Sequence, residues 1–145
     1  MNFVEEMKNK AIALQKRLVL PEGTEERTIT AAAQIISEKI AKEVILLGNN
    51  EEIKKVADSI GVSLQGITLI DPEKSEWLKD FAQEYYELRK KKGMTEEQAA
   101  VDIKHFLRFG AMMVRKGLAD SMIAGALSST ADVLRAGLTI IGTAP

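Results

Sequence analysis

Short apolar segments alternate with amphipathic ones through the first half of the sequence, and this alternation constrains the fold more than any other feature. Segments 17–20, 43–47 and 66–70 are apolar, compatible with β-strands, and each is followed by a turn signal. Between them, apolar residues recur at helical spacing over 24–40 and 51–60. Strands that alternate with helices pair in parallel through right-handed crossovers. The sequence therefore predicts an α/β fold of three layers (α/β/α), with helices on both faces of a mostly parallel sheet. The pattern does not determine the strand order.

Local signals predict where the helices begin and end. A first amphipathic helix is expected over 2–16. Thr24 is the predicted N-cap of the next helix, which has Arg27 in its first turn. The inward face of that helix is expected to carry Ile29, Ala32, Ala33, Ile36 and Ile40. Gly61 is well placed to end the helix over 51–60.

The pattern changes to helices alone between the third strand and Gly117. One helix is expected over 75–92. A second begins at Thr95, because Thr95 and Gln98 match a capping box. Gly110 lies inside the apolar run that follows, so this run is expected to form two helices or to make a close packing contact, rather than to form one long rod.

The last part of the sequence predicts a strand, a turn and a helix. Segment 120–124 is a short apolar run that suits a strand covered on both faces. Ser128, Ser129 and Thr130 then offer N-cap side chains, and 131–141 carries apolar residues at helical spacing. The buried stripe of this helix is expected to consist of Val133, Leu134, Leu138 and Ile141.

The start of this last helix is a candidate anion site. Free N–H groups and the helix dipole favour negative charge at a helix N-terminus. Ser128, Ser129 and Thr130 add hydroxyl donors. Arg135 could reach the same point, because helical side chains lean toward the N-terminus. Plain N-capping beside a solvated arginine explains the pattern equally well, so the residues alone leave both interpretations open.

Composition argues against several classes of function. The 145 residues include 20 basic and 21 acidic ones, so the net charge indicates no nucleic acid or other polyanion as partner. Cysteine is absent and His105 is the one histidine, which argues against a thiol nucleophile, a disulfide framework and a histidine-based metal site. No apolar segment resembles a secretory signal or reaches membrane-spanning length. We therefore expect a cytoplasmic protein without a membrane partner.

The basic cluster at residues 89–92 has two interpretations. It lies at a predicted helix C-terminus, where cations are favourable for dipole reasons alone. Alternatively, Arg89 docks a phosphorylated ligand, since a guanidinium pairs with phosphate through two hydrogen bonds.

Two familiar nucleotide sites are missing from the sequence. The first predicted strand is followed by Pro21-Glu22-Gly23 rather than a dinucleotide-binding fingerprint, and no P-loop motif occurs.

Five segments, taken together and in order, resemble the N-terminal half of the phosphate acetyltransferases (phosphotransacetylases). They are L-P-E-G-T-E-E-R-T at 20–28, V-I-L-L-G-N at 44–49, Y-E-L-R-K-K-K-G-M-T at 86–95, A-D-S-M-I-A-G-A-L-S-S-T-A-D-V-L-R at 119–135, and I-G-T-A-P at the end. The resemblance covers essentially the whole chain and implies the fold of the first domain of these enzymes, which is isocitrate dehydrogenase-like. It also implies reversible transfer of an acetyl group between coenzyme A and inorganic phosphate by a homodimer.

The resemblance implies roles for particular residues. Arg89 and Arg135 would bind substrate, and Arg135 would also take part in catalysis. Ser128, Ser129 and Thr130 would border the same cleft. Coenzyme A and acetyl phosphate or phosphate are then the substrates, and the resemblance implies neither a cofactor nor a metal ion.

The chain departs from the family pattern in its length. Family members are about twice as long, and their proposed catalytic aspartate and an associated Ser-Arg pair lie near the far C-terminus, which no segment here matches. Residues 1–145 are therefore expected to form a single α/β domain, the N-terminal part of a two-domain enzyme, which by itself is inactive and self-associates. A smaller departure is Ala136, where many relatives have proline.

Three alternatives to this function stay open. One is phosphate butyryl transfer, because the wider family includes phosphate butyryltransferases. Another is a non-catalytic module that senses acyl-CoA or phosphate, like the domain fused to some malic enzymes. The third is a scaffold domain without a ligand, in which every hydroxyl and arginine is structural.

Overall fold

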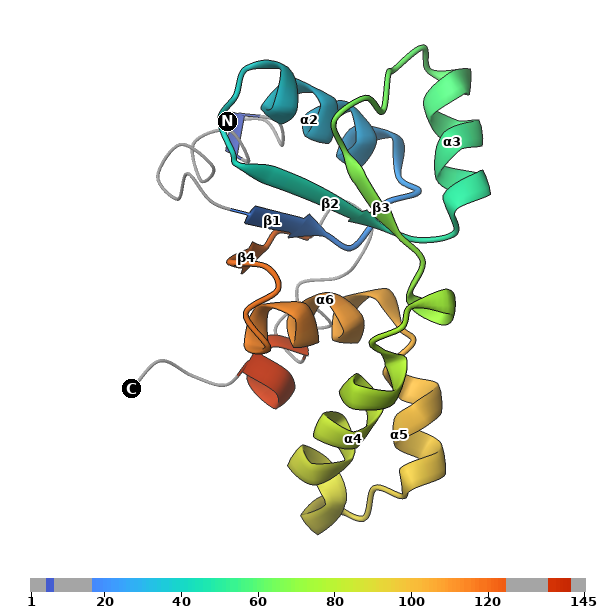
Figure 1. Cartoon of the computed structure of the whole chain (residues 1–145), viewed down its shortest axis with the longest axis vertical. Helices are drawn as coiled ribbons and strands as arrows, with labels where there is room; N and C mark the ends of the chain where they lie inside the picture. Colours follow the sequence, from blue (N-terminus) through green and yellow to red (C-terminus); the bar gives the residue numbers. More distant parts are fainter. Residues whose placement is uncertain (1–4, 7–16, 125–135, 142–145) are drawn as a thin grey trace.

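The computed structural model describes residues 5–6, 17–124 and 136–141, and these residues have the predicted α/β architecture (Figure 1). One parallel sheet contains β1 (Arg17–Leu20), β2 (Glu43–Leu47), β3 (Thr68–Ile70) and β4 (Ser121–Met122). The strands lie in the order β3-β2-β1-β4. β1 is therefore interior: Leu18 pairs with Val44 on one side and with Ser121 on the other.

Helices cover both faces of the sheet (Figure 1). One face carries α2 (Glu26–Ser37) and α3 (Asn50–Ser59). The other face carries α6 (Phe106–Arg115), with α4 (Leu78–Arg89) and α5 (Glu96–Asp102) extending away from the sheet as a pair. Short segments complete this layer: the 3₁₀ turns η1 (Pro72–Lys74) and η2 (Lys90–Lys92), and the π-helical turn η3 (Gly137–Ile141). No helix in the described ranges has the length and apolar character needed to cross a bilayer.

Side chains alternate along the strands and build two separate cores. Leu18 and Leu20 of β1 pack with the buried side chains of α2 and α3. Val19 points to the opposite face, as do Ile45 and Leu47 of β2, and there they pack with residues of α4, α5 and α6. This alternation follows from the two-residue repeat of a strand. A core thus lies on each face of the sheet, which confirms the three-layer prediction.

Two of the four strands have the bounds that the sequence predicted, and the other two are shorter. β1 and β2 have the predicted bounds. β3 begins at Thr68 rather than at Gly66, because Gly66 has a φ of +83° and forms a left-handed turn that a strand cannot include. β4 is shorter than predicted. It is held beside β1 by Asp120, whose carboxylate accepts the backbone N–H of Arg17 at 2.9 Å and its Nε–H at 3.2 Å.

The N-cap of α2 is Glu25, and the prediction of Thr24 is wrong by one residue. The Glu25 carboxylate accepts the backbone N–H groups of Arg27 at 2.7 Å and Thr28 at 3.2 Å. A carboxylate also suits the positive end of the helix dipole. Because glutamate is not among the preferred N-cap residues, the local pattern favoured the threonine.

Two predicted buried faces are partly wrong. The buried residues of α2 are Thr28, Ile29, Ala31, Ala32 and Ile35, whereas Ala33 and Ile36 are half-buried. In the C-terminal segment Ile141 is 40% exposed and Ile140 is buried in its place. The wider π-helical turn of η3 shifts these positions relative to an α-helix. Val133, Leu134, the Leu138 side chain and most of the predicted helix over 2–16 lie outside the described residues, although Glu5 and Glu6 are helical.

The region before β4 contains two helices, as one of the alternatives predicted, but they do not separate at Gly110. The break lies just before α6, where His105 Nδ1 accepts the backbone N–H of Leu107 at 3.2 Å and caps the helix. Gly110 is buried inside α6 against β4. A Cβ at this position would lie 2.9 Å from Met122 Sδ, so the close-contact prediction is also right.

Candidate functional site

The strand order identifies one edge of the sheet as a place for a ligand. β2 and β3 lie on one side of β1 and β4 lies on the other, so the direction of winding reverses at β1. Ligands of doubly wound sheets bind outside the carboxyl ends of the strands at such a reversal. The predicted Ser128–Thr130 turn and Arg135 follow β4 in the sequence. These residues lie outside the described part of the chain, so their roles stay predictions.

The turn after β1 is packed tightly at the same edge. Gly23 donates its N–H to the carbonyl of Leu47 at 3.1 Å, and a Cβ on Gly23 would lie 2.3 Å from that oxygen. Glu22 and Thr28 beside it are 3% and 1% exposed. Residues of these types are seldom buried so completely. The Pro21-Glu22-Gly23 segment is thus closely packed against the end of β2, and the Gly23 position has no room for a larger side chain.

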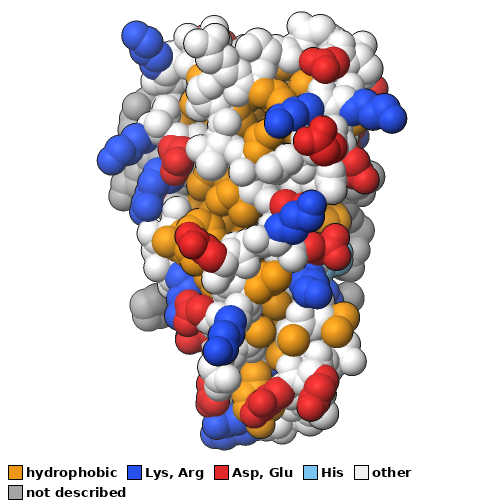
Figure 2. All heavy atoms as spheres, turned by 45° about the vertical axis from the view of Figure 1, so that its right-hand side comes forward, with side chains coloured by type: hydrophobic (Ala, Val, Ile, Leu, Met, Phe, Trp, Pro, Cys, Tyr) orange, Lys and Arg blue, Asp and Glu red, His pale blue; other side chains and the backbone are white. Residues whose placement is uncertain are grey.

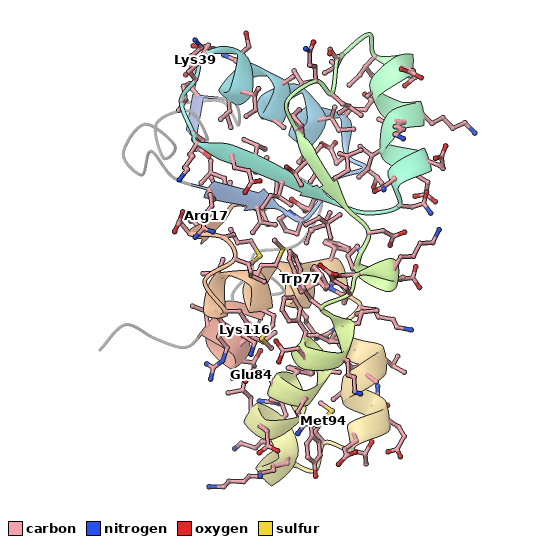
Figure 3. The ribbon with its side chains drawn as sticks, viewed as in Figure 1. Arg17, Lys39, Trp77, Glu84, Met94 and Lys116 are labelled. Atoms are coloured by element: carbon pink, nitrogen blue, oxygen red, sulfur yellow. The ribbon has the colours of Figure 1, made fainter. Side chains whose placement is uncertain are left out.

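A pocket of about 350 Å³ lies between the helices below the sheet. Its walls come from α4, α6, the last residue of α5, the turns on either side of α5, and the segment 136–139. The lining residues are Tyr85, Arg89, Met94, Asp102, His105, Leu107, Arg108, Ala136 and Thr139. Figure 3 shows the labelled Met94 between α4 and α5. Volumes of roughly 300–1,000 Å³ are typical of small-molecule sites.

Arg89, the described member of the predicted site, lines this pocket. Its Nε is buried and has no hydrogen-bond partner among the residues that the structure describes. The lysines beside it behave differently, because Lys90, Lys91 and Lys92 are all exposed. Lys90 donates to Glu87 at 2.6 Å, and this hydrogen bond raises the pKa of Lys90. The basic cluster therefore divides into a solvated part and one arginine that lines the pocket.

Arg108 also lines the pocket, and sequence reasoning missed it. It lies in the first turn of α6, on a helix whose other residues are mostly buried and apolar. Its Nη1 donates to the carbonyl of Asp102 at 3.5 Å, the outer limit for a hydrogen bond. No motif marks this residue. The one available signal was a charged residue within an apolar helical run.

Three further polar residues of the pocket, Asp102, His105 and Thr139, have hydrogen-bond partners. The Asp102 carboxylate accepts Gln98 Nε2 at 2.7 Å, and His105 caps α6. Thr139 Oγ1 donates to the carbonyl of Ala136 at 3.5 Å. Ala136, which lines the pocket, directly follows Arg135 in the sequence, and Arg135 itself lies outside the described residues. Within the described ranges, no three His, Asp or Glu side chains gather closely enough to hold a metal ion.

Comparison with known proteins shows the family to which the chain belongs. A family model described as "Phosphate acetyl/butaryl transferase" matches residues 2–145. The sequence is 50% identical over 145 residues to a phosphate acetyltransferase of Treponema pallidum, and 49% identical to one of Acetivibrio thermocellus. Both alignments cover all of this chain but only 43% of the relative. The chain therefore spans less than half the length of these relatives.

Solved structures support the same relationship. The EutD phosphotransacetylase from Staphylococcus aureus superposes on the whole chain with a TM-score of 0.83 at 34% identity. A phosphotransacetylase from Streptococcus pyogenes gives a TM-score of 0.85, also at 34% identity. The chain covers 44% of each of these structures. The similarity confirms the predicted fold class.

Proposed function

The chain belongs to the phosphate acetyl/butaryl transferase family, and we therefore propose that it supplies part of the substrate cleft of an enzyme that moves an acetyl group reversibly between coenzyme A and inorganic phosphate. The relatives named above are phosphate acetyltransferases or phosphotransacetylases. One observation within the chain carries the proposal. The Nε of Arg89 is buried without a partner among the described residues, and Arg89 lines a pocket of small-molecule size.

The proposed reaction is an acyl transfer between sulfur and oxygen. The thiol sulfur of coenzyme A forms a bond to the carbonyl carbon of acetyl phosphate, and the bond from that carbon to the phosphate oxygen breaks. Phosphate leaves with the electron pair, and the thiol proton passes to a general base. Following the resemblance, we place that base outside these 145 residues. Because a general base contributes roughly 10²–10⁴-fold in rate, the chain alone is expected to bind substrate without measurable acetyl transfer.

The family pattern suggests how the arginines divide the work. We propose that Arg135 stabilises the charge on the departing phosphate and that Ser128, Ser129 and Thr130 donate hydrogen bonds to it. Their sequence position after β4, at the reversal of the sheet, supports this role. We propose that Arg89 holds a part of coenzyme A away from the reacting bond, since its pocket is built from the helices below the sheet.

A chimera tests the proposed activity. Residues 1–145 would replace the matching segment of the Treponema pallidum phosphate acetyltransferase, which is 50% identical to them. The chimera should transfer acetyl groups between acetyl phosphate and coenzyme A. Circular dichroism and titration with coenzyme A would establish that it is folded and binds. A folded chimera that binds coenzyme A but is inactive, or that prefers butyryl phosphate, would contradict the proposal of acetyl transfer.

Substitutions in the same chimera test the separate roles. Loss of one charge-assisted contact should cost roughly 1.5–3 kcal/mol, or about ten- to a hundredfold. Arg135→Ala should lower kcat, whereas Arg89→Ala should raise the KM for coenzyme A and leave the KM for acetyl phosphate unchanged. Arg135→Lys should recover little, because lysine cannot pair with phosphate through two parallel bonds. Unaltered kinetics in the double alanine variant would show that neither arginine contacts substrate.

We also propose that the protein is cytoplasmic and forms a homodimer. Support for association comes from a groove between α4 and α5 that includes Leu78, Ala82, Tyr86, Ala100 and Val101. Val101 is 63% exposed, and Figure 2 shows hydrophobic side chains between charged ones on this part of the surface. Exposed apolar patches favour partners. Light scattering should show a dimer at micromolar concentration, and a monomer at all concentrations would contradict the homodimer. Cell fractionation tests the location.

A further inference from the structure

Two arginines differ from the other arginines in the described part of the chain. Three form ion pairs with carboxylates: Arg17 with Asp120 at 3.2 Å, Arg27 with Glu25 at 3.2 Å and Arg115 with Glu84 at 2.9 Å. Arg89 and Arg108 have no carboxylate partner among the described residues, and both line the same pocket. The two arginines that have no carboxylate partner among the described residues thus line one pocket.

Neither guanidinium has its hydrogen-bonding capacity satisfied within the described residues. An arginine has five N–H donors. Arg89 Nε is buried and has no partner within the described ranges, a state that is rare for a polar atom in a folded protein. The one hydrogen bond that Arg108 makes there spans 3.5 Å to the carbonyl of Asp102. Both side chains therefore keep donors for a ligand that carries several acceptor oxygens.

The rest of the lining indicates the kind of ligand. Asp102 brings one negative charge, and one of its oxygens is taken up by Gln98 Nε2 at 2.7 Å. Two arginines outweigh this charge, so the pocket attracts anions. Tyr85, Met94 and Leu107 supply apolar surface. A volume of about 350 Å³ leaves space for an organic group beside the anion.

We propose that Arg108 is a second anion-binding residue of this pocket, and that it shares one phosphate group of the ligand with Arg89. A phosphate monoester carries nearly two negative charges at neutral pH and three acceptor oxygens, which match two guanidinium groups better than one. The choice of ligand rests on the proposed function, in which coenzyme A carries a phosphate monoester and the small substrate, inorganic phosphate, offers a similar charge and similar acceptor oxygens. Arg108 is then a substrate-binding residue that the sequence pattern did not reveal.

Titrations of the 145-residue chain test this inference. Coenzyme A and inorganic phosphate would each be titrated into the wild-type chain and into Arg108→Ala, Arg108→Lys, Arg89→Ala and the double variant. Arg108→Ala should weaken binding of one of the two ligands by about ten- to a hundredfold. A selective effect on coenzyme A assigns the phosphate to coenzyme A, and a selective effect on inorganic phosphate assigns it to the small substrate. Arg108→Lys should recover little of the affinity, because it restores the charge but not the paired hydrogen bonds of a guanidinium.

The double variant separates a shared phosphate from two independent effects. If both arginines bind one group, the loss in the double variant should differ clearly from the product of the two single losses. Lys91→Ala removes an exposed charge near the end of α4 and should leave both affinities unchanged. Urea unfolding should show that Arg108→Ala is as stable as wild type, since it loses one long hydrogen bond.

The outcomes distinguish this inference from the function on which it rests. A wild-type chain that binds neither coenzyme A nor phosphate would overturn both. Binding that Arg89→Ala weakens and Arg108→Ala leaves unchanged would overturn the role of Arg108 alone. Single losses that multiply without coupling would overturn the shared phosphate.

Discussion

Arg115 donates from Nε to Oε2 of Glu84 at 2.9 Å and so fastens the last turn of α6 to α4. The same guanidinium donates from Nη1 to the carbonyl of Ile140 at 3.1 Å, which holds η3 against these two helices. Ala136 and Thr139 on this C-terminal segment line the Arg89 pocket. One arginine that does not line the pocket thus fixes one of its walls.

Replacing Arg115 should therefore affect both stability and binding. Arg115→Ala should lower the free energy of unfolding by about 1–2 kcal/mol, because it removes a partly exposed ion pair and a hydrogen bond to a backbone carbonyl. It should also weaken binding of coenzyme A, because η3 loses its anchor. Urea unfolding and calorimetric titration measure the two effects. Lys90→Ala, which breaks an exposed pair with Glu87, is the control and should change neither. An Arg115→Ala variant with wild-type stability and affinity would refute this anchor.

Lys116 should make a contribution to stability that depends on pH. Its Nζ lies 3.1 Å from Asp80 Oδ2 and 3.7 Å from Glu84 Oε1, and Figure 3 shows the labelled Lys116 and Glu84 side by side. The hydrogen bond to Asp80, with the charges of both carboxylates, raises the pKa of Lys116 above its ordinary value of 10.5. A raised pKa means that the folded state holds the proton more tightly than the unfolded state.

This stabilisation is complete below pH 10.5 and is lost as the pH rises through the raised pKa of the folded state. Lys116→Gln should thus be less stable than wild type at neutral pH, and the difference should shrink at alkaline pH. Urea unfolding of both proteins from neutral to strongly alkaline pH measures this. A difference that is constant with pH would show that the amine contributes through packing alone.

Gly23 should not tolerate a side chain. A Cβ there would lie 2.3 Å from the carbonyl oxygen of Leu47, a backbone atom that cannot move aside without disturbing β2. Gly23→Ala should therefore destabilise the protein by roughly 1–3 kcal/mol, as overpacking does in other cores. Gly137→Ala is a matched control, because nothing lies within 4 Å of its Cβ position. Thermal unfolding should show a lower midpoint for the first variant and an unchanged or higher midpoint for the second. Equal midpoints would contradict the tight packing of this turn.

The sequence predicted those parts of the fold that depend on neighbouring residues. β1 and β2 have the predicted bounds because each is an apolar run closed by turn residues. Thr95 caps α5 as predicted, its Oγ1 accepting the backbone N–H of Gln98 at 3.1 Å. The capping box is not completed, since Gln98 donates its side-chain amide to Asp102 instead. Such competition between partners cannot be read from spacing.

The parts that sequence reasoning missed depend on contacts between distant segments. The strand order places β4 beside β1 through residues about a hundred positions apart, and no local pattern contains that pairing. Arg108 joins Arg89 in one pocket because α6 folds back across α4, so neither residue marks the other in the sequence. Arg89 was found through its motif, which resembles that of a known family. Ser128, Ser129, Thr130 and Arg135 remain predictions from that resemblance.

Coenzyme A should bind to this chain in the pocket lined by Arg89. Met94 lines that pocket, whereas Met112 and Met113 are buried in the core and serve as internal references. A titration with coenzyme A, followed by NMR of carbon-13-labelled methionine methyl groups, therefore locates binding directly. Met94→Leu assigns the reporting signal. We expect a saturable shift of the Met94 methyl signal, little change for Met112 and Met113, and loss of the shift in Arg89→Ala at the same concentration. Saturable binding of coenzyme A that leaves the Met94 signal unmoved would contradict this expectation.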